Sequence, residues 1–300
     1  MNKAAVIVIG SNSTRCVAAD LDHPQTLPLR SRVETRLFLG MENDSLSDFA
    51  IQDTLAGIEA LIREVHVPIL GIYATSAVRD ARNANRLAQQ MEGRFSLPLT
   101  ILTGEEEAAA SFYGAAGDEA AGVVDIGGGS TELAFGREGE IAQAISLQLG
   151  ASRLFKAHPI NGEEDIIPAR EAAMQILDTL PEALIRHEGI STFYSVGGTG
   201  TACAMLALQV MDKALCESYR LTRDTLGKLL RLVAVTPREK RKAIPCFPAG
   251  RIDILPTGMV ILSAVMDKLQ LEHITVTQRC NADGLLRRAG LRRSTGLRRT

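Results

Sequence analysis

Two short turns of glycine, serine and threonine are the part of this sequence whose residue types best suit binding chemistry. The first reads Gly10-Ser-Asn-Ser-Thr14 and the second Gly127-Gly-Gly-Ser-Thr131, and each follows a short apolar run. A turn of small residues exposes several backbone N–H groups on one side, and hydroxyls add further donors, so such a turn can bind a phosphate. Asp125 stands just before the second turn, and carboxylate oxygens suit Mg²⁺. The two turns therefore predict a site for a phosphate anion and a divalent cation.

A third turn and a run of acids are weaker candidates. Gly197-Gly-Thr-Gly-Thr201 follows an apolar strand and opens a predicted helix. It could present a helix N-terminus to another phosphate or a nucleoside, although a plain strand-to-helix turn explains it equally well. Glu105, Glu106 and Glu107 begin another helix. A capping box with Thr103 accounts for Glu106 and explains Glu107 less well, because Glu107 shares a helix face with Ser111. Glu107 and, less favoured, Glu105 therefore stay open as candidates for chemistry.

An internal repeat organises the chain. Residues 6–14 align with residues 123–131 at an offset of 117, and both copies are predicted to be strand, tight turn and second strand. Elsewhere short apolar strands alternate with helical segments, which favours an α/β fold. The predicted strands are 5–9, 69–74, 100–102, 122–126, 193–196 and 273–277, and the predicted helices are 46–64, 81–91, 166–186 and 256–269.

We therefore expect two similar α/β domains in tandem, 1–118 and 119–300, whose two turns face each other across an interdomain cleft. The sequence around Gly117–Gly122 has the composition of a hinge. The last helix is a candidate to pack back on the first domain.

Composition and charge exclude several classes of protein. The 300 residues carry a net charge of −2, contain 4% aromatic residues and lack Trp. These values disfavour a nucleic-acid or anionic-membrane partner and a binder built on aromatic stacking. The five cysteines lie far apart, which predicts reduced thiols, and no apolar stretch approaches the ~18 residues of a membrane span. We expect a soluble, cytoplasmic protein with a solvated basic tail at 287–299.

Several segments together resemble the exopolyphosphatase and guanosine pentaphosphate phosphohydrolase family, a branch of the superfamily of actin, sugar kinases and heat-shock chaperone ATPases. They are Gly10–Ser13, Ala74–Arg79, Gly104–Ala108, Asp125–Leu133, the turn 197–201, and Arg251-x-Asp253 before Gly258. The resemblance implies two actin-like (ribonuclease-H-like) domains in the short, two-domain form.

The resemblance also implies a role for single residues. Glu107 matches the catalytic base, and Asp125 and Glu132 match metal-side carboxylates. The residues implied to bind phosphate are Gly10, Ser11, Asn12, Ser13, Arg79, Gly127, Gly128, Gly129, Ser130, Thr131, Gly197, Gly198 and Thr199.

Three positions depart from the family pattern. Val8 stands where the family has an Asp before the first turn, and the repeat likewise places Val8 opposite Asp125. Ala109 stands where Arg is common, and 280–282 replaces an expected Gly-Leu-Arg segment. The loss of a carboxylate at Val8 predicts weak metal binding and reduced turnover. The substitution Val8→Asp should tighten Mg²⁺ binding, unless burial leaves the new charge uncompensated.

These observations favour a hydrolase that releases terminal phosphate from inorganic polyphosphate or guanosine pentaphosphate, assisted by Mg²⁺ or another divalent cation, with Glu107 as general base. Two alternatives stay open. One is a non-catalytic protein that binds polyphosphate or a guanosine alarmone, for which Val8 is the motive. The other is a small-molecule kinase of the actin fold, which the acids of 104–108 disfavour. The sequence leaves open whether the protein is a monomer or a homodimer.

Overall fold

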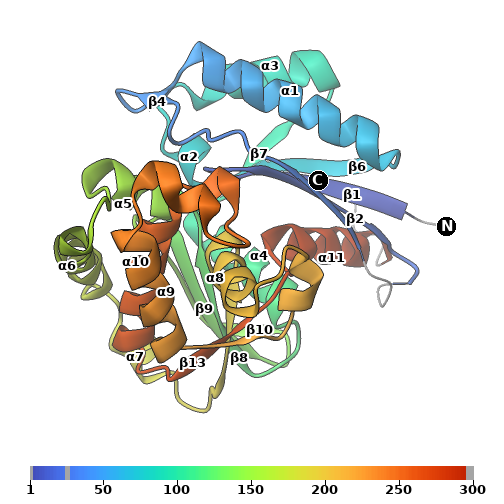
Figure 1. Cartoon of the computed structure of the whole chain (residues 1–300). Helices are drawn as coiled ribbons and strands as arrows, with labels where there is room; N and C mark the ends of the chain where they lie inside the picture. Colours follow the sequence, from blue (N-terminus) through green and yellow to red (C-terminus); the bar gives the residue numbers. More distant parts are fainter. Residues whose placement is uncertain (1–2, 24–27, 295–300) are drawn as a thin grey trace.

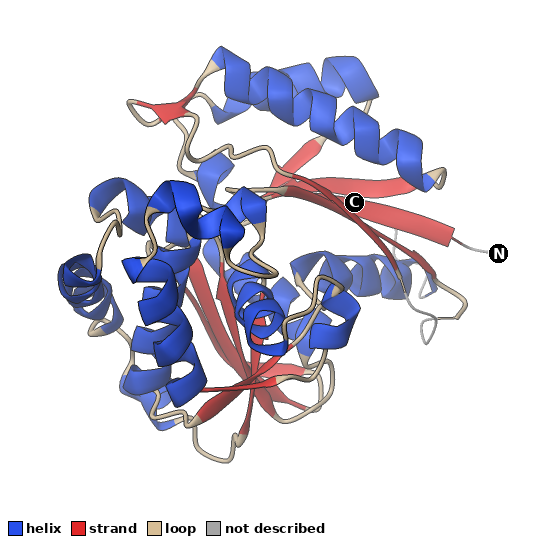
Figure 2. Ribbon diagram, in the orientation of Figure 1, coloured by secondary structure: helices blue, strands red, loops and turns tan. Residues whose placement is uncertain are grey.

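The computed structural model describes residues 3–23 and 28–294. Two large β-sheets carry the fold (Figures 1 and 2). The first has the order β3-β2-β1-β6-β7, with β1 Lys3–Ile9, β2 Thr14–Asp20, β3 Leu29–Val33, β6 Ile69–Ala74 and β7 Leu99–Ile101. The second has the order β10-β9-β8-β11-β13-β12, with β8 Ala121–Ile126, β9 Thr131–Arg137, β10 Glu140–Leu147, β11 Thr192–Val196, β12 Arg220–Thr222 and β13 His273–Val276. A small hairpin joins β4 Met41–Glu42 to β5 Ser45–Leu46.

The two large sheets repeat one topology. In each, an antiparallel run of three strands (β1-β2-β3 and β8-β9-β10) is followed by two strands parallel to the first, β6 and β7 in one case and β11 and β13 in the other. In the part of the chain that the structure describes, the second sheet has an additional edge strand, β12, with no counterpart in the first. The predicted α/β class and the predicted internal repeat are therefore confirmed.

Helices cover the sheets in three groups. The α-helices are α1 Asp48–Val65, α2 Ser76–Arg79, α3 Ala84–Phe95, α4 Gly104–Ala115, α5 Ala151–Ala157, α6 Ile166–Leu177, α7 Glu182–Arg186, α8 Gly198–Leu208, α9 Arg223–Val235, α10 Leu255–Lys268 and α11 Asn281–Ser294. Helices α1 and α3 lie on the outer face of the first sheet, whereas α5 to α10 gather beside the second (Figure 1). Helices α4 and α11 pack on each other, and α11 also reaches β1 and β2.

Three apolar cores follow from this arrangement. One lies between the first sheet and α1, and a larger one lies between the second sheet and α6, α8, α9 and α10. The third joins the facing sides of the two sheets to α4 and α11, and it contains Val8, Val17, Val123 and Phe112. The ends of β1 and β8, where the two predicted turns begin, are held by this shared core.

The predicted helix 166–186 is wrong as one element. It is broken into α6 and α7, because the chain turns at 178–180 and Pro181, which cannot donate a helical hydrogen bond, immediately precedes α7. The other predicted helices and strands occur with ends shifted by a few residues. Among the described residues, no helix has the length and apolar character needed to cross a bilayer.

Candidate active site

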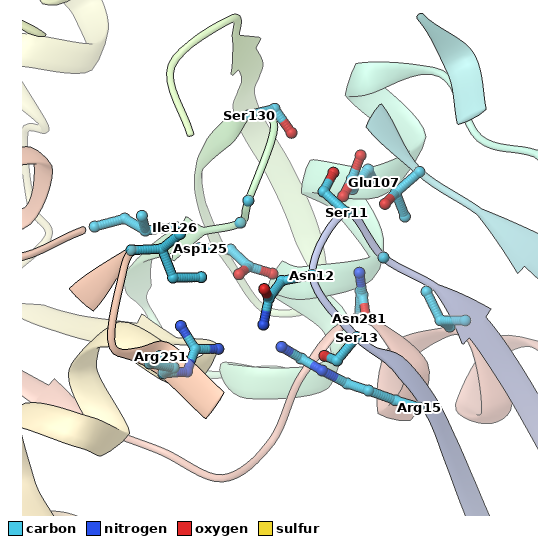
Figure 3. A pocket seen from close by; sticks show the side chains of 16 residues that line it. Ser11, Asn12, Ser13, Arg15, Glu107, Asp125, Ile126, Ser130, Arg251 and Asn281 are labelled. Carbon is cyan, nitrogen blue, oxygen red and sulfur yellow. The ribbon is translucent and has the colours of Figure 1, made fainter. Parts of the chain in front are cut away.

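A pocket lies where the ends of β1 and β8 meet, and both halves of the repeat line it (Figure 3). Its lining residues are Val8, Gly10, Ser11, Asn12, Ser13, Arg15, Thr75, Glu107, Asp125, Ile126, Gly127, Gly128, Ser130, Arg251, Ile254 and Asn281. Nine of the residues implied by the family resemblance are therefore brought together in one cavity.

The two turns have the same internal hydrogen bond. The N–H of Gly10 donates to the carbonyl of Ser13 at 3.1 Å, and the N–H of Gly127 donates to the carbonyl of Ser130 at 3.0 Å. The turns also touch each other, because a Cβ at Gly128 would lie only 2.8 Å from the Cβ of Ser11. Glycine is required there by the close approach of the second turn to the first. The two turns therefore face each other, as the repeat predicts.

Glu107 enters the pocket from the first turns of α4. This helix begins with the predicted capping box between Thr103 and Glu106. The side chain of Glu107 is buried, and its Oε2 accepts a hydrogen bond of 3.0 Å from Nη1 of Arg79. Burial raises the pKa of Glu107 to about 7, against the opposing effect of the Arg79 charge. A carboxyl group in this range can take up and release a proton near neutral pH.

Arg79 lies behind Glu107 and not in the pocket wall. Its Nη1 also donates to the carbonyl of Leu102 at 2.9 Å, which fixes the guanidinium between that carbonyl and Glu107. Its Nη2 is buried without a hydrogen-bond partner. In this geometry Arg79 orients the Glu107 carboxyl and favours its ionised form. The predicted contact of Arg79 with a phosphate would require Nη2 to reach the ligand.

Asp125 and Glu132 are directly opposed on β8 and β9. Asp125 lines the pocket and accepts a hydrogen bond of 2.6 Å from Ser111, the residue predicted to share the face of Glu107. Glu132 lies outside the lining, fully buried, and accepts a hydrogen bond of 2.7 Å from Ser146. Burial raises the pKa of both carboxyls, and the charges of Glu107 and Asp125 raise that of Glu132 further. A cation beside these acids would relieve their mutual repulsion.

The third turn supports the pocket from behind. Gly197 has a φ of +89°, and a Cβ there would lie 2.9 Å from Oδ1 of Asp125. A Cβ at Gly198 would overlap the guanidinium of Arg251, and Thr199 is fully buried. The structure places none of these three residues in the lining.

Two residues of the second turn, Gly129 and Thr131, also lie outside the pocket lining. The Thr131 hydroxyl donates a hydrogen bond to the carbonyl of Leu149.

Among the lining residues for which the sequence predicts no role, Arg15, Arg251 and Asn281 carry nitrogen donors, and Arg251 appears in the sequence analysis only as part of a family motif. Arg15 and Arg251 point into the pocket from different elements (Figure 3), and neither guanidinium has an ion pair or hydrogen bond with the described residues. Burial, with the charges of Arg32 and Arg15, lowers the pKa of Arg251 to about 9. The repeat could have revealed Arg15, because it occupies the position of Glu132 in the other copy.

Two amide side chains complete the lining. Asn12 is buried with both Nδ2 and Oδ1 lacking a hydrogen-bond partner, and Oδ1 of Asn281 is in the same state. Buried polar atoms are nearly always partnered in native proteins, so these atoms indicate a ligand or water in the pocket. Asn281 falls in the segment that departs from the family pattern.

The oxygen ligands that the pocket offers to a metal suit a divalent ion that keeps part of its water shell. The described residues hold no group of three or more His, Cys, Asp or Glu side chains arranged around one metal position. Asp125 is the one metal-side carboxylate in the lining, and Val8 occupies the equivalent place in the other half. Mg²⁺ commonly takes one or two carboxylates and completes its shell with water and substrate phosphates, which this set allows.

The repeated sheets, with a polar pocket between their two turns, define an actin-like α/β protein. The model of the Ppx/GppA phosphatase family matches residues 32–292, and the chain belongs to that family. This confirms the family predicted from the sequence motifs.

Relatives and solved structures agree with this assignment. The chain is 28% identical over 298 residues to guanosine-5'-triphosphate,3'-diphosphate pyrophosphatase of Vibrio campbellii, covering 94% of this chain and 58% of the relative. The fold is shared with an exopolyphosphatase from Cytophaga hutchinsonii (TM-score 0.85, 21% identity, 99% of each chain). It is also shared with the Aquifex aeolicus family member (TM-score 0.79, 24% identity, 97% of this chain and 98% of the other). The chain thus spans little more than half the length of the curated relatives it matches.

Proposed function

We propose that this protein is a phosphoanhydride hydrolase that releases terminal phosphate from inorganic polyphosphate or guanosine pentaphosphate. The observation that carries the proposal is one pocket that holds a buried carboxyl with a pKa of about 7, two glycine-rich turns and two guanidinium groups that form no ion pair with the described residues. The name of the Vibrio relatives supports the nucleotide as a substrate, and the name of the Cytophaga structure supports polyphosphate.

Hydrogen-bond donors of the pocket would bind the phosphate groups of the substrate. The backbone N–H groups of the two turns and the hydroxyls of Ser11, Ser13 and Ser130 would bind the terminal phosphate. Arg15 and Arg251 would neutralise its charge, because a guanidinium suits two-point contact with phosphate oxygens. The pocket wall contains no aromatic side chain on which a base could stack, so the phosphates and not the base would supply the main contacts.

The chemical step would use Glu107 as general base. A water oxygen would attack the terminal phosphorus while Glu107 accepts one of the water protons. The bond from that phosphorus to the bridging oxygen would break, and the shortened chain would leave with the bridging oxygen. Positioning and charge neutralisation supply most of the rate in such reactions. Arg79 would act by holding Glu107 in place.

A divalent cation would be held by Asp125, with Glu132 behind it. When bound, it would supply positive charge to the phosphate oxygens. Val8 leaves the opposite side of the pocket without a second carboxylate, so the binding would be weak.

The deciding experiment measures phosphate release from polyphosphate and from guanosine pentaphosphate, with Mg²⁺ and with a chelator. Release that needs Mg²⁺ supports the proposal. Tight binding without release favours the non-catalytic alternative that Val8 motivates, and ADP formation that needs an acceptor favours a kinase.

The five cysteines are all free thiols, four of them buried, which supports our proposal that the protein works in the reducing cytoplasm.

A further inference from the structure

The start of α5 binds the carbonyl groups of the second turn. Two backbone N–H groups of α5 donate to the carbonyls of Gly127 and Gly128, at 2.9 and 2.8 Å. The Arg153 side chain completes the series, because its Nε donates to the carbonyl of Gly129 at 2.7 Å. The next peptide unit is trans, so the N–H of Ser130 points opposite to that carbonyl and away from Arg153. Ser130 lines the pocket, and its N–H is one of the donors proposed to bind the terminal phosphate.

Arg153 is itself held by the other half of the molecule. Helix α5 lies beside α2 of the first half (Figure 1), and Nη2 of Arg153 pairs with Oδ2 of Asp80, the C-cap of α2, at 2.5 Å. The Ser76 hydroxyl donates to the same oxygen at 3.3 Å. The guanidinium also lies 4.9 Å over the ring of Phe38, whose N–H donates to the carbonyl of Ser11 at 2.8 Å. One guanidinium therefore contacts the second turn and two segments of the first half.

The second turn fits closely against the first half at this point. A Cβ at Gly129 would lie 2.4 Å from Oγ of Ser76 and 2.9 Å from Oγ of Ser11. The side chains of Arg153 and Asp80 are 33% and 24% exposed, and neither lines the pocket. Partly exposed ion pairs add little to stability, so the loss of this pair should change the orientation of the turn more than the stability of the fold.

We propose that Arg153 is a positioning residue of the phosphate site. It holds the peptide between Gly129 and Ser130 in the orientation that presents the Ser130 N–H to the phosphate, and Asp80 fixes the guanidinium for this task. In this role Arg153 acts through Ser130 and does not touch the substrate. The inference rests on the proposed function and deepens it.

The test measures the dissociation constants of orthophosphate and tripolyphosphate by titration calorimetry, in proteins that carry Glu107→Gln to block turnover. Arg153→Met removes the nitrogen donors and keeps an apolar chain against Phe38. Asp80→Ala removes the partner in the first half, and it keeps the test decisive if Arg153→Met does not fold. Melting temperatures verify folding and measure any structural loss separately.

The matched control is Arg170→Met. Arg170 pairs with Asp267 at 2.7 Å, and the two side chains are 36% and 34% exposed, close to the values of Arg153 and Asp80. This control pair joins α6 to α10 within the second half and lies outside the pocket lining. Arg170→Met therefore removes the same kind of ion pair without touching either turn.

The expected result is a dissociation constant for orthophosphate that rises about tenfold in Arg153→Met, the usual scale for one hydrogen bond to a charged group. Asp80→Ala should raise it several-fold, although removal of a negative charge near an anion would by itself tighten binding. The double variant should bind no more weakly than Arg153→Met, because both substitutions break one arrangement. Tripolyphosphate should follow the same order, and Arg170→Met should stay within twofold of its parent.

Three outcomes would overturn the inference. Unchanged binding in Arg153→Met, with or without a lower Tm, would leave the residue a structural role alone. Tighter or unchanged binding in Asp80→Ala would show that charge and not orientation governs the site. A parent protein that binds neither anion would remove the proposed phosphate site together with this inference.

The proposed hydrolase is tested separately, by phosphate release from tripolyphosphate in the protein with native Glu107. If that protein releases no phosphate while the variants bind as expected, the hydrolase fails and the role of Arg153 stands.

Discussion

At the scale of single residues, Glu107 sets how the pocket responds to pH. Its pKa of about 7 means that the base is half protonated at neutral pH. We expect kcat/KM to rise with pH through about 7 and then level off. Because the Arg79 charge lowers the pKa of Glu107, Arg79→Met should move this midpoint to higher pH. Profiles of kcat/KM against pH for both proteins measure the shift, and a midpoint that stays or falls would contradict the assigned roles.

Glu107 should also leave a signature in stability. Its folded pKa lies above the ordinary value of 4.5, so the folded state holds its proton more tightly than the unfolded state. The free energy of unfolding therefore falls as pH rises from about 4.5 to about 7. Glu107→Gln stays neutral, and its Tm relative to wild type should rise by several degrees between pH 4 and pH 8. If the difference in Tm between the two proteins does not vary with pH, the pKa of Glu107 is not raised in the folded state.

The sequence predicts that Val8→Asp tightens Mg²⁺ binding, whereas the structure predicts that it weakens phosphate binding. Val8 is buried, which argues against a free charge, but it lies directly opposite Arg15. An Asp there would pair with Arg15, so we expect a folded protein whose dissociation constant for orthophosphate rises several-fold. Val8→Asn has the same shape without the charge and should change binding much less. Calorimetry with orthophosphate and with Mg²⁺ measures both effects, and unaltered phosphate binding in Val8→Asp would remove Arg15 from the anion site.

At the scale of elements, the sequence predicts the strands well because each is a short apolar run bounded by turn residues. The repeat further predicts that the two turns are equivalent, which the matching hydrogen bonds at Gly10 and Gly127 bear out. Helix ends were harder to predict. The start of α8 at Gly198 depends on tertiary packing, since glycine has little helical preference of its own.

The packing of α4 on α11 could not be predicted from either helix alone. A Cβ at Gly114 would overlap the carbonyl oxygen of Cys280, and one at Gly284 would overlap that of Ala110. Such close approach is visible only when both helices are placed.

Gly114→Ala should therefore force the two helices apart. We expect a loss of about 1–3 kcal/mol in the free energy of unfolding, seen as a Tm lower by several degrees. Gly93→Ala on α3 is the control, because a Cβ there meets no atom within 4 Å and alanine favours a helix. Equal Tm changes in the two variants would show that the contact between α4 and α11 is not tight.

At the scale of the whole molecule, the pocket depends on how the two sheets are placed relative to each other. Ion pairs cross between the halves, from Arg153 to Asp80 at 2.5 Å and from Arg30 to Asp283 at 2.5 Å. The sequence indicates Glu107, Asp125 and the two turns because their local motifs carry the information. Arg15 and Arg251 lie far apart in the chain and meet only through this placement, so no local pattern marks them as partners.

The role of Glu107 as general base is tested by measuring phosphate release by Glu107→Gln and by Glu105→Gln, a substitution on the same helical turn. Glu105 is exposed and serves as the matched control, whereas Glu107 lies buried in the pocket. We predict that Glu107→Gln loses ~10²–10⁴-fold in kcat, the usual effect of removing a general base, while tripolyphosphate still binds within a few-fold of wild type. Glu105→Gln should keep the wild-type rate. A Glu107→Gln protein with wild-type turnover, or a Glu105→Gln protein without turnover, would show that Glu107 is not the general base.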